Sequence, residues 1–303
     1  MKTRICQTII AIIAAILISS CSSQEEDIDG GGTSTALVPG EQVLHTFNAD
    51  YPNATNTLWS IRRDYFVADF TAGANQYRTW FTKEGVRVVE KKYITYGDLD
   101  SKVIDAFMRT NYASWDIRKT YQLARRNFAT ISGISVILNG RISNLYFTMN
   151  GDYIRVADDF SEYSDAPINV PQALQTEIND MFDQPTIVDL AFVDVVNSEI
   201  SVGLITDEHF ITAFFTKDFY WIVNFWEVSL SELPEAVQNG YLNSRYSQLP
   251  LIHIRIMESP GYSSYLFYVV RDGKTVIIEF NAAGQATTEL SRQHVMTKYL
   301  LTR

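Results

Sequence analysis

The stretch "WFTKEGVRVV", from Trp80 to Val89, has the pattern of a β-hairpin. An aromatic strand end is followed by a short polar turn that contains Gly85, and a β-branched strand comes after it. Glycine suits a turn residue that needs a positive φ angle. Three further stretches repeat this pattern later in the chain: "YFTMNGDYIRV", "FFTKDFYWIVN" and "EFNAAGQATTE".

The four hairpins are evenly spaced. The Phe residues that end their first strands are 66, 68 and 65 residues apart. Three copies keep a glycine four residues later, whereas the third copy has Phe219 there, so we expect its turn to differ. The strand-end residues are Phe81, Phe147, Phe215 and Phe280.

A stripe of apolar residues with helical spacing precedes each copy, as in Val43, Phe47 and Tyr51. Two β-like segments lie between each stripe and its hairpin. The repeating unit is therefore one helix followed by four antiparallel strands. One such unit is marginal alone. We predict an α+β fold of tandem helix-plus-four-stranded antiparallel sheet repeats, with two repeats in each domain.

The N-terminus resembles a bacterial lipoprotein signal. Lys2 and Arg4 precede the apolar run "IIAIIAAILI", which is too short for an ordinary membrane-spanning helix, and "SSC" follows it. "LISSC" is similar to a lipobox, which implies cleavage before Cys21 and lipidation of its thiol. The alternative is an ordinary signal peptide that ends near a cysteine. Cys6 would leave with the signal, so we expect no disulfide in the mature chain.

These signals predict where the protein is located. The acidic cluster that follows Cys21 resembles the surface-export signal of lipoproteins in the Bacteroides group. We therefore expect an outer-membrane lipoprotein, displayed on the cell surface or otherwise facing the periplasm, that contacts the membrane through its lipid alone.

The polar stretch "SEYSDAPINV" separates the second hairpin from the third unit and suggests a linker. The predicted segments are a signal peptide over 1–20, the lipidated cysteine and a flexible tether over 21–40, domain 1 over 41–160, the linker over 161–167, domain 2 over 168–291 and a C-terminal tail over 292–303.

The motifs resemble the β-lactamase-inhibitor-like, PepSY-like domain family of Bacteroides-group secreted proteins. The resemblance is carried by Tyr51, Pro52, Ala54 and Trp59, by "FVADF" and "WFTKEG", and in the second copy by "YASWDI". It covers residues 41–160 well and 168–290 more loosely. It implies a curved antiparallel sheet with helices on one side, and a binding or inhibitory module.

The residues give no sign of a catalytic or metal site. No G-x-S-x-G motif occurs, and the four histidines lie in different units without a zinc spacing. The net charge of −10 gives no footprint for nucleic acid. We expect no enzyme activity and no cofactor. The alternative is an enzyme such as a glycoside hydrolase, in which the fold brings together two carboxylates that are distant in the sequence. Two basic spots, Glu90–Lys92 and Ala124–Arg126, are interpreted as exposed strand ends.

Strand alternation separates the hairpin residues into two faces. We expect the Phe81 face to be core beneath the helices. With a two-residue loop, Phe81 would pair with Val86 and Trp80 with Arg87; the later copies would pair Tyr146 with Tyr153 and Phe214 with Trp221. The second face would then be an exposed contact surface rich in interface residue types. Its residues are Arg78, Trp80, Arg87, Tyr146, Tyr153, Phe214 and Trp221.

Two other interpretations of this face stay open. The aromatic residues could be cross-strand pairs that stabilise the sheet, or the two domains could pack on them. In the fourth unit Glu279 and Ala286 occupy the corresponding positions, so an aromatic patch should fade there.

The sequence therefore predicts a noncatalytic, lipid-anchored module that binds an unidentified protein, such as a secreted or envelope enzyme that it would inhibit. The alternative is a carbohydrate-binding surface lipoprotein, because aromatic platforms also stack on sugars. A structural component of the envelope is a further rival.

Overall fold

The computed structural model describes residues 37–158, 166–193, 199–206 and 209–290. The predicted signal peptide, Cys21, nearly all of the tether, most of the linker and the C-terminal tail lie outside the described residues.

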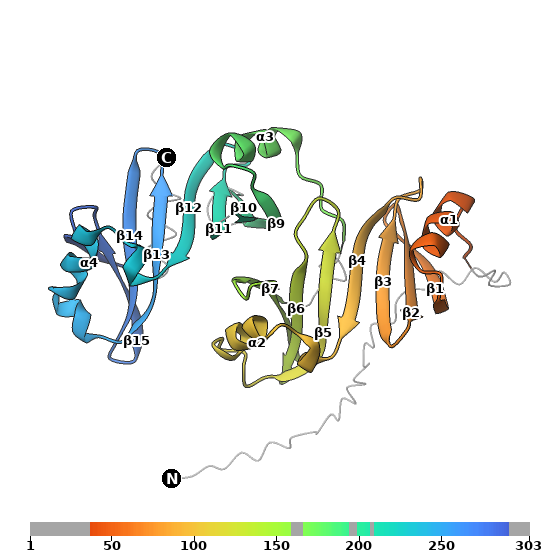
Figure 1. Ribbon diagram of the computed structural model, residues 1–303, viewed down its shortest axis with the longest axis horizontal. Coiled ribbons are helices and arrows are strands. Elements are labelled where there is room, and N and C mark those ends of the chain that lie inside the picture. The colour runs from red at the N-terminus through yellow and green to blue at the C-terminus, as the bar shows by residue number, and fades with distance from the viewer. Residues whose placement is uncertain (1–36, 159–165, 194–198, 207–208, 291–303) are drawn as a thin grey trace, which may run out of the picture. The chain divides into compact units, whose positions relative to one another are not determined.

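The first half of the described chain forms one eight-stranded sheet with two helices (Figure 1). Its strands follow chain order, and every neighbouring pair is antiparallel. The elements are α1 (Glu41–Asp50), β1 (Ala54–Arg62), β2 (Tyr65–Ala72), β3 (Asn75–Phe81), β4 (Arg87–Ile94), η1 (Tyr96–Asp98), α2 (Ser101–Met108), β5 (Asp116–Arg125), β6 (Ile131–Leu138), β7 (Arg141–Thr148) and β8 (Tyr153–Asp158).

The second half forms another eight-stranded antiparallel sheet, again in chain order. The α+β class with antiparallel sheets is confirmed. The elements are α3 (Gln172–Met181), β9 (Thr186–Val193), β10 (Glu199–Ile205), β11 (Phe210–Phe215), β12 (Trp221–Val228), η3 (Leu230–Glu232), α4 (Glu235–Leu242), η4 (Arg245–Gln248), β13 (Leu251–Ser259), β14 (Tyr262–Arg271), β15 (Lys274–Phe280) and β16 (Ala286–Leu290).

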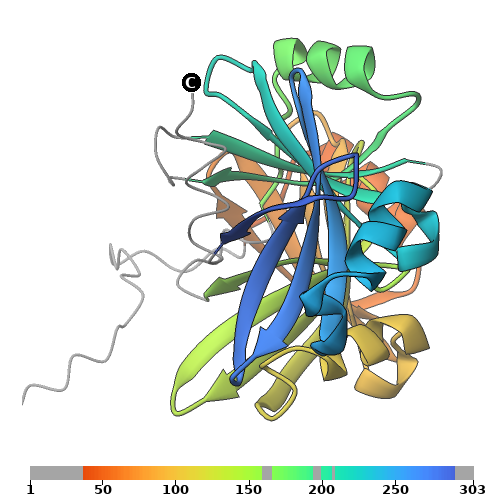
Figure 2. The same ribbon diagram turned by 90° about the vertical axis from the view of Figure 1, so that its left-hand side faces the viewer.

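The helices pack through their predicted apolar stripes. In α2, the Asp100 side chain caps the helix by accepting a hydrogen bond from the Lys102 backbone N–H at 2.9 Å. Val103 and Phe107 of α2 then contact the sheet beneath. In the second sheet, Tyr241 of α4 stacks on Phe267 with ring centroids 4.3 Å apart. In Figure 2, α4 (light blue) lies on one side of the blue strands of that sheet.

The predicted core face of the hairpins is confirmed. All four strand-end Phe residues have no exposed surface and belong to the clusters that contain the helix side chains. Burying a Phe side chain contributes about 1.5–3 kcal/mol, so each residue is a substantial part of its local core. The four are Phe81, Phe147, Phe215 and Phe280.

The hairpin turns share one hydrogen-bond pattern. In the first, the Gly85 N–H donates to the Thr82 carbonyl at 3.0 Å, and the Thr82 N–H donates to the Val86 carbonyl at 2.9 Å. The expectation of a different third turn was wrong. Phe219 adopts the same positive φ, +69°, and its N–H donates to the Thr216 carbonyl at 2.9 Å.

The predicted strand register was also wrong. Phe81 pairs with Arg87, not with Val86, and Trp80 pairs with Val89 across a bulge. The turn contains one more residue than a two-residue loop, which moves Arg87 to the opposite face, and the bulge at Val88 then restores the predicted face of Val89 and Lys91. Arg87 is therefore on the Phe81 side, which the helix covers.

The later copies show the same shift. Phe147 pairs with Tyr153, Phe215 with Trp221, and Phe280 with Ala286. Tyr153 and Trp221 accordingly share a face with the core Phe residues and are not opposite Tyr146 and Phe214.

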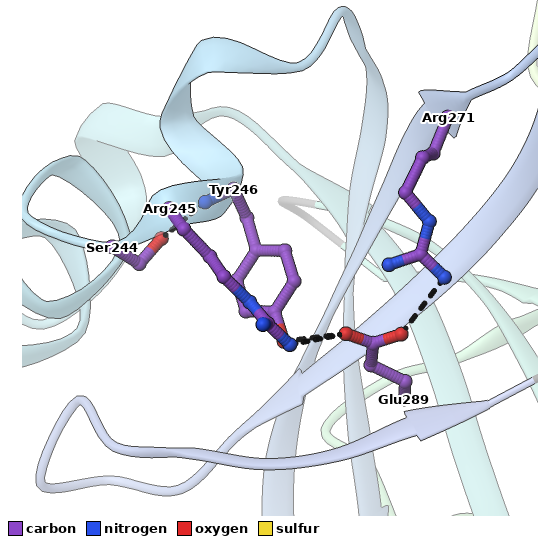
Figure 3. A network of polar contacts seen from close by, with 5 residues as sticks. All are labelled: Ser244, Arg245, Tyr246, Arg271 and Glu289. Atoms are coloured by element: carbon purple, nitrogen blue, oxygen red, sulfur yellow. Dashed lines mark hydrogen bonds and ion pairs between the residues drawn. The ribbon is translucent and has the colours of Figure 1, made fainter.

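A polar network fixes the last described strand (Figure 3). The Glu289 carboxylate of β16 accepts hydrogen bonds from Arg245 at 2.8 Å and from the Tyr246 hydroxyl at 2.7 Å, and its other oxygen lies 2.9 Å from Arg271. These donors hold the pKa of Glu289 at about 2, chiefly through Arg271 and then Tyr246. The carboxylate thus connects η4 and β14 to the edge strand.

Candidate functional site on the helix-free face of the first sheet

The face of the first sheet opposite α1 and α2 is here called the helix-free face. Its apolar part contains Trp80, which pairs with Val67 and Val89 across neighbouring strands. A second row places Tyr121 beside Tyr146 across Gly133. Gly133 is required here, because a Cβ at this position would overlap the Tyr121 ring.

Cations are interleaved with these aromatic rings. The Lys91 ammonium lies 3.7 Å from the centre of the Tyr121 ring, and the Arg155 guanidinium lies 4.7 Å from the centre of the Tyr146 ring. Cations over aromatic faces contribute about 0.5–2 kcal/mol, most where water is excluded. Lys91 and Tyr121 are both buried, so this contact belongs to the stronger kind.

Residues that follow the first sheet in the chain complete the cluster. Val188 of β9 and Ala166 are buried in the same apolar cluster as Trp80 and Tyr146, and Phe210 of β11 packs against it. A backbone hydrogen bond of 2.8 Å also joins the sheets, from the Ala129 N–H to the Ile187 carbonyl. The helix-free face is therefore covered by the ends of β9 and β11 instead of by a helix.

One buried carboxylate receives two arginines at this junction. Asp189 of β9 accepts a hydrogen bond from the Arg155 Nε–H, and Arg125 Nη1 lies 3.7 Å from its other oxygen. The side chains of Arg125 and Asp189 are only 3% and 4% exposed. Burial alone would lower the pKa of Arg155, but the adjacent Asp189 carboxylate leaves that pKa above its usual value.

The predicted exposed contact surface is not present as expected. Trp80, Tyr146 and Phe214 are 1%, 0% and 7% exposed, so none of them forms an open platform. Trp80 and Tyr146 share one cluster, whereas Phe214 belongs to a separate cluster of the second sheet. Packing between the two sheets, one of the open interpretations, accounts for the burial of Trp80 and Tyr146.

The other predicted contact residues have separate environments. Arg78 pairs with Asp69 at 2.7 Å. Arg87 donates to the Tyr51 hydroxyl at 2.8 Å and lies 3.0 Å from Glu90. These contacts tie Arg87 to the end of α1.

Tyr153 and Trp221 complete the predicted set. Tyr153 is 41% exposed and meets the Phe147 ring edge-on at 5.7 Å. Trp221 donates to the Asn224 side chain at 2.9 Å and packs against the α3 cluster. The structure therefore brings only Trp80 and Tyr146 of the seven into one cluster.

The charged members of the site were not predicted from the sequence. Lys91 and Arg125 were taken as exposed strand ends, but they are 8% and 5% exposed. Alternation along β4 places Lys91 on the same face as Val89, two residues away. That signal was present in the sequence, whereas the approach of Asp189 from a distant strand was not.

Other kinds of site find no support in the described part of the chain. Over residues 37–158, 166–193, 199–206 and 209–290, no three His, Cys, Asp or Glu side chains are grouped as metal ligands. No helix in those ranges has the length and apolar composition needed to cross a membrane.

Comparison with known proteins gives structural neighbours only. No protein-family model and no curated protein match the chain. Structural neighbours include DUF2874 and BLIP-like proteins of Bacteroides.

Each neighbour corresponds to less than half of this chain. A BLIP-like protein from Bacteroides fragilis is 25% identical, covers 48% of this chain and 99% of its own, and has a TM-score of 0.40. A DUF2874 family protein from Bacteroides ovatus is 23% identical, covers 42% and 94%, and has a TM-score of 0.40. One from Bacteroides uniformis is 20% identical, covers 43% and 96%, and also has a TM-score of 0.40.

Proposed function

We propose that this chain is a noncatalytic, lipid-anchored module of the cell envelope that binds another protein. The observation that carries the proposal is the helix-free face of the first sheet. It combines Trp80, Tyr121 and Tyr146 with the buried Arg125 and the partly exposed Arg155, and Trp, Tyr and Arg are the residue types that dominate binding hot spots. A partner that is an enzyme would be inhibited if this face covered its active site.

We further propose that the module is built from four helix-plus-four-strand units, two in each domain, with domains over 41–160 and 168–291. Two observations support the proposal. A helix precedes each group of four strands in the order of elements. The four hairpins also repeat one pair of turn hydrogen bonds, closed by Thr82, Thr148, Thr216 and Asn281.

The proposed anchor is the lipidated Cys21 at the outer membrane. Its support is the N-terminal sequence, in which a short apolar run leads directly into "SSC". Orientation toward the surface, or otherwise toward the periplasm, follows from the acidic residues after that cysteine.

The carbohydrate-binding alternative requires the same opening of the face as protein binding does. Stacking on sugars requires an aromatic ring that a ligand can reach, and the three aromatic residues expected to provide the platform are buried. These are Trp80, Tyr146 and Phe214.

A photo-crosslinking experiment tests the proposal. Tyr65, at the rim of the helix-free face with its ring 6.0 Å from that of Trp80, is replaced by a photoreactive phenylalanine in the full-length protein in its native cells. The control places the same group at Asp180, an exposed position of α3. We expect a discrete protein adduct from position 65 alone.

Three results would count against protein binding through this face. Absence of any adduct at position 65, or the same adducts at both positions, would contradict protein binding through this face. Retention of the purified protein on a glycan array would instead support the carbohydrate alternative.

A further inference from the structure

We propose that Asp189 is a latch that holds the second sheet over the helix-free face, so that the partner-binding face is closed in this structure and opens when the latch is released. This proposal rests on the proposed function, because it assigns an occluded state to the same face. It places the control of binding in a contact between Asp189, Arg125 and Arg155.

The two sheets can separate without loss of any strand pairing. Within the described residues, the Ala129–Ile187 bond is the single backbone hydrogen bond between them. Each sheet is otherwise complete, with β8 and β9 at the ends of their own sheets. Opening would therefore break no strand pairing. Among the contacts of the described residues, it would break that hydrogen bond, the ion pairs of Asp189, and the packing of Val188, Ile205 and Phe210 on the apolar cluster of the first sheet.

The ion pairs in this contact also favour an interface that can open. Burying an ion pair costs desolvation that its attraction need not repay, so such a pair adds little net stability, although removing one partner leaves the other charge unpaired. Contacts between domains that are polar and limited in size behave like transient protein interfaces. Asp189 and its two arginines lie in this polar part, beside the apolar cluster that contains Val188 and Trp80.

The geometry also indicates the chemistry of the partner. In the closed state the face is occupied by a carboxylate next to an aliphatic side chain, Asp189 beside Val188. A partner segment that presents an acidic residue next to a small apolar residue would satisfy the same arginines and aromatic rings. The partner chemistry is therefore an acidic, partly apolar peptide segment that replaces β9 on this face.

The chain offers a clean reporter of opening, because its cysteines are only Cys6 and Cys21. In the mature chain with Cys21→Ser, Val67→Cys places one thiol in the closed face, where Val67 has no exposed surface. Val103→Cys places a thiol of equal burial beneath α2. The rate of maleimide labelling then reports how often each region opens.

We expect Asp189→Asn to raise the labelling rate of Val67→Cys by about tenfold or more, and to leave that of Val103→Cys within about twofold, because local opening exposes only the first site. Arg155→Gln, which removes the other side of the pair at a partly exposed position, should give the same selective increase. Asp183→Asn, an exposed acid just before β9, is the matched control and should change neither rate.

Two results would overturn the latch. One is an equal increase at both thiols, which would mean general destabilisation. The other is an unchanged rate at Val67→Cys in both variants. Neither result depends on a partner, so a failure of the Tyr65 crosslinking experiment is distinguishable from a failure of the latch.

Discussion

Gly85 shows why a glycine recurs in the hairpins. Its φ of +78° disfavours side chains, and a Cβ there would lie 2.6 Å from the Gln42 carbonyl oxygen in the first turn of α1. Gly151 has the same relation to the Lys102 carbonyl of α2, at 2.5 Å. Glycine at this position therefore allows both the positive φ of the turn and the close contact between the turn and the helix.

This double role predicts the cost of adding one methyl group. Gly73→Ala, at φ +60° with open space around it, should lose about 1 kcal/mol through backbone strain alone. Gly85→Ala should lose a further ~1–3 kcal/mol, because the turn and α1 must move apart. Urea unfolding of both variants measures the difference, and equal losses would contradict the proposed contact.

Single residues also mark the limit of sequence-based prediction. Phe81 was assigned to the core correctly, because alternation and the four copies agree. Arg87 was placed on the wrong face, because the turn holds one residue more than expected; the bulge at Val88 restores the predicted face from Val89 onward. Nothing in the "KEG" turn states by itself whether the loop contains two residues or three.

At the scale of elements, the helices were predictable from their apolar stripes. Val43 and Phe47 of α1 are buried as their spacing indicates. The end of the second sheet was not predictable, because the Glu289 network joins residues more than 40 positions apart. No short motif signals such a contact.

The Glu289 network predicts a pH dependence. Its pKa of about 2 in the folded chain lies below the ordinary 4.5, so the network stabilises the fold fully above about pH 4.5. That stabilisation is lost as the pH falls from about 4.5 toward 2. We expect the stability difference between the wild type and Glu289→Gln to shrink over this window.

Hydrogen exchange of the β16 amides as a function of pH measures this effect. The control is Glu177→Gln on α3, outside the network, which should leave the exchange of β16 unchanged. A wild-type-to-Glu289→Gln difference that stayed constant from pH 6 to pH 2.5 would count against the network.

At the scale of the whole molecule, the surroundings of Trp80 were beyond sequence-based prediction. Its strand pattern correctly indicates the face opposite the helices. Its cover comes from Val188 and Phe210, which are more than 100 residues away in the chain. Whether an aromatic face is open depends on such distant contacts, and no local pattern records them.

The proposed anchor makes a prediction for the whole protein. Cys21→Ser should move the protein from the membrane fraction to the soluble fraction and abolish labelling by a radioactive fatty acid, because the acyl chains are its proposed membrane contact. Ser22→Ala is the matched control and should remain in the membrane fraction. Retention of Cys21→Ser in the membrane fraction would contradict anchoring by that thiol.

The strictly sequential order of the strands has a consequence for how the chain folds. From β1 to β8, and from β9 to β16, each new strand pairs with the one made just before it. Such local pairing keeps contact order low, and low contact order favours rapid folding. A chain that is delivered N-terminus first across a membrane can therefore add one strand at a time to a growing edge, without waiting for its C-terminus.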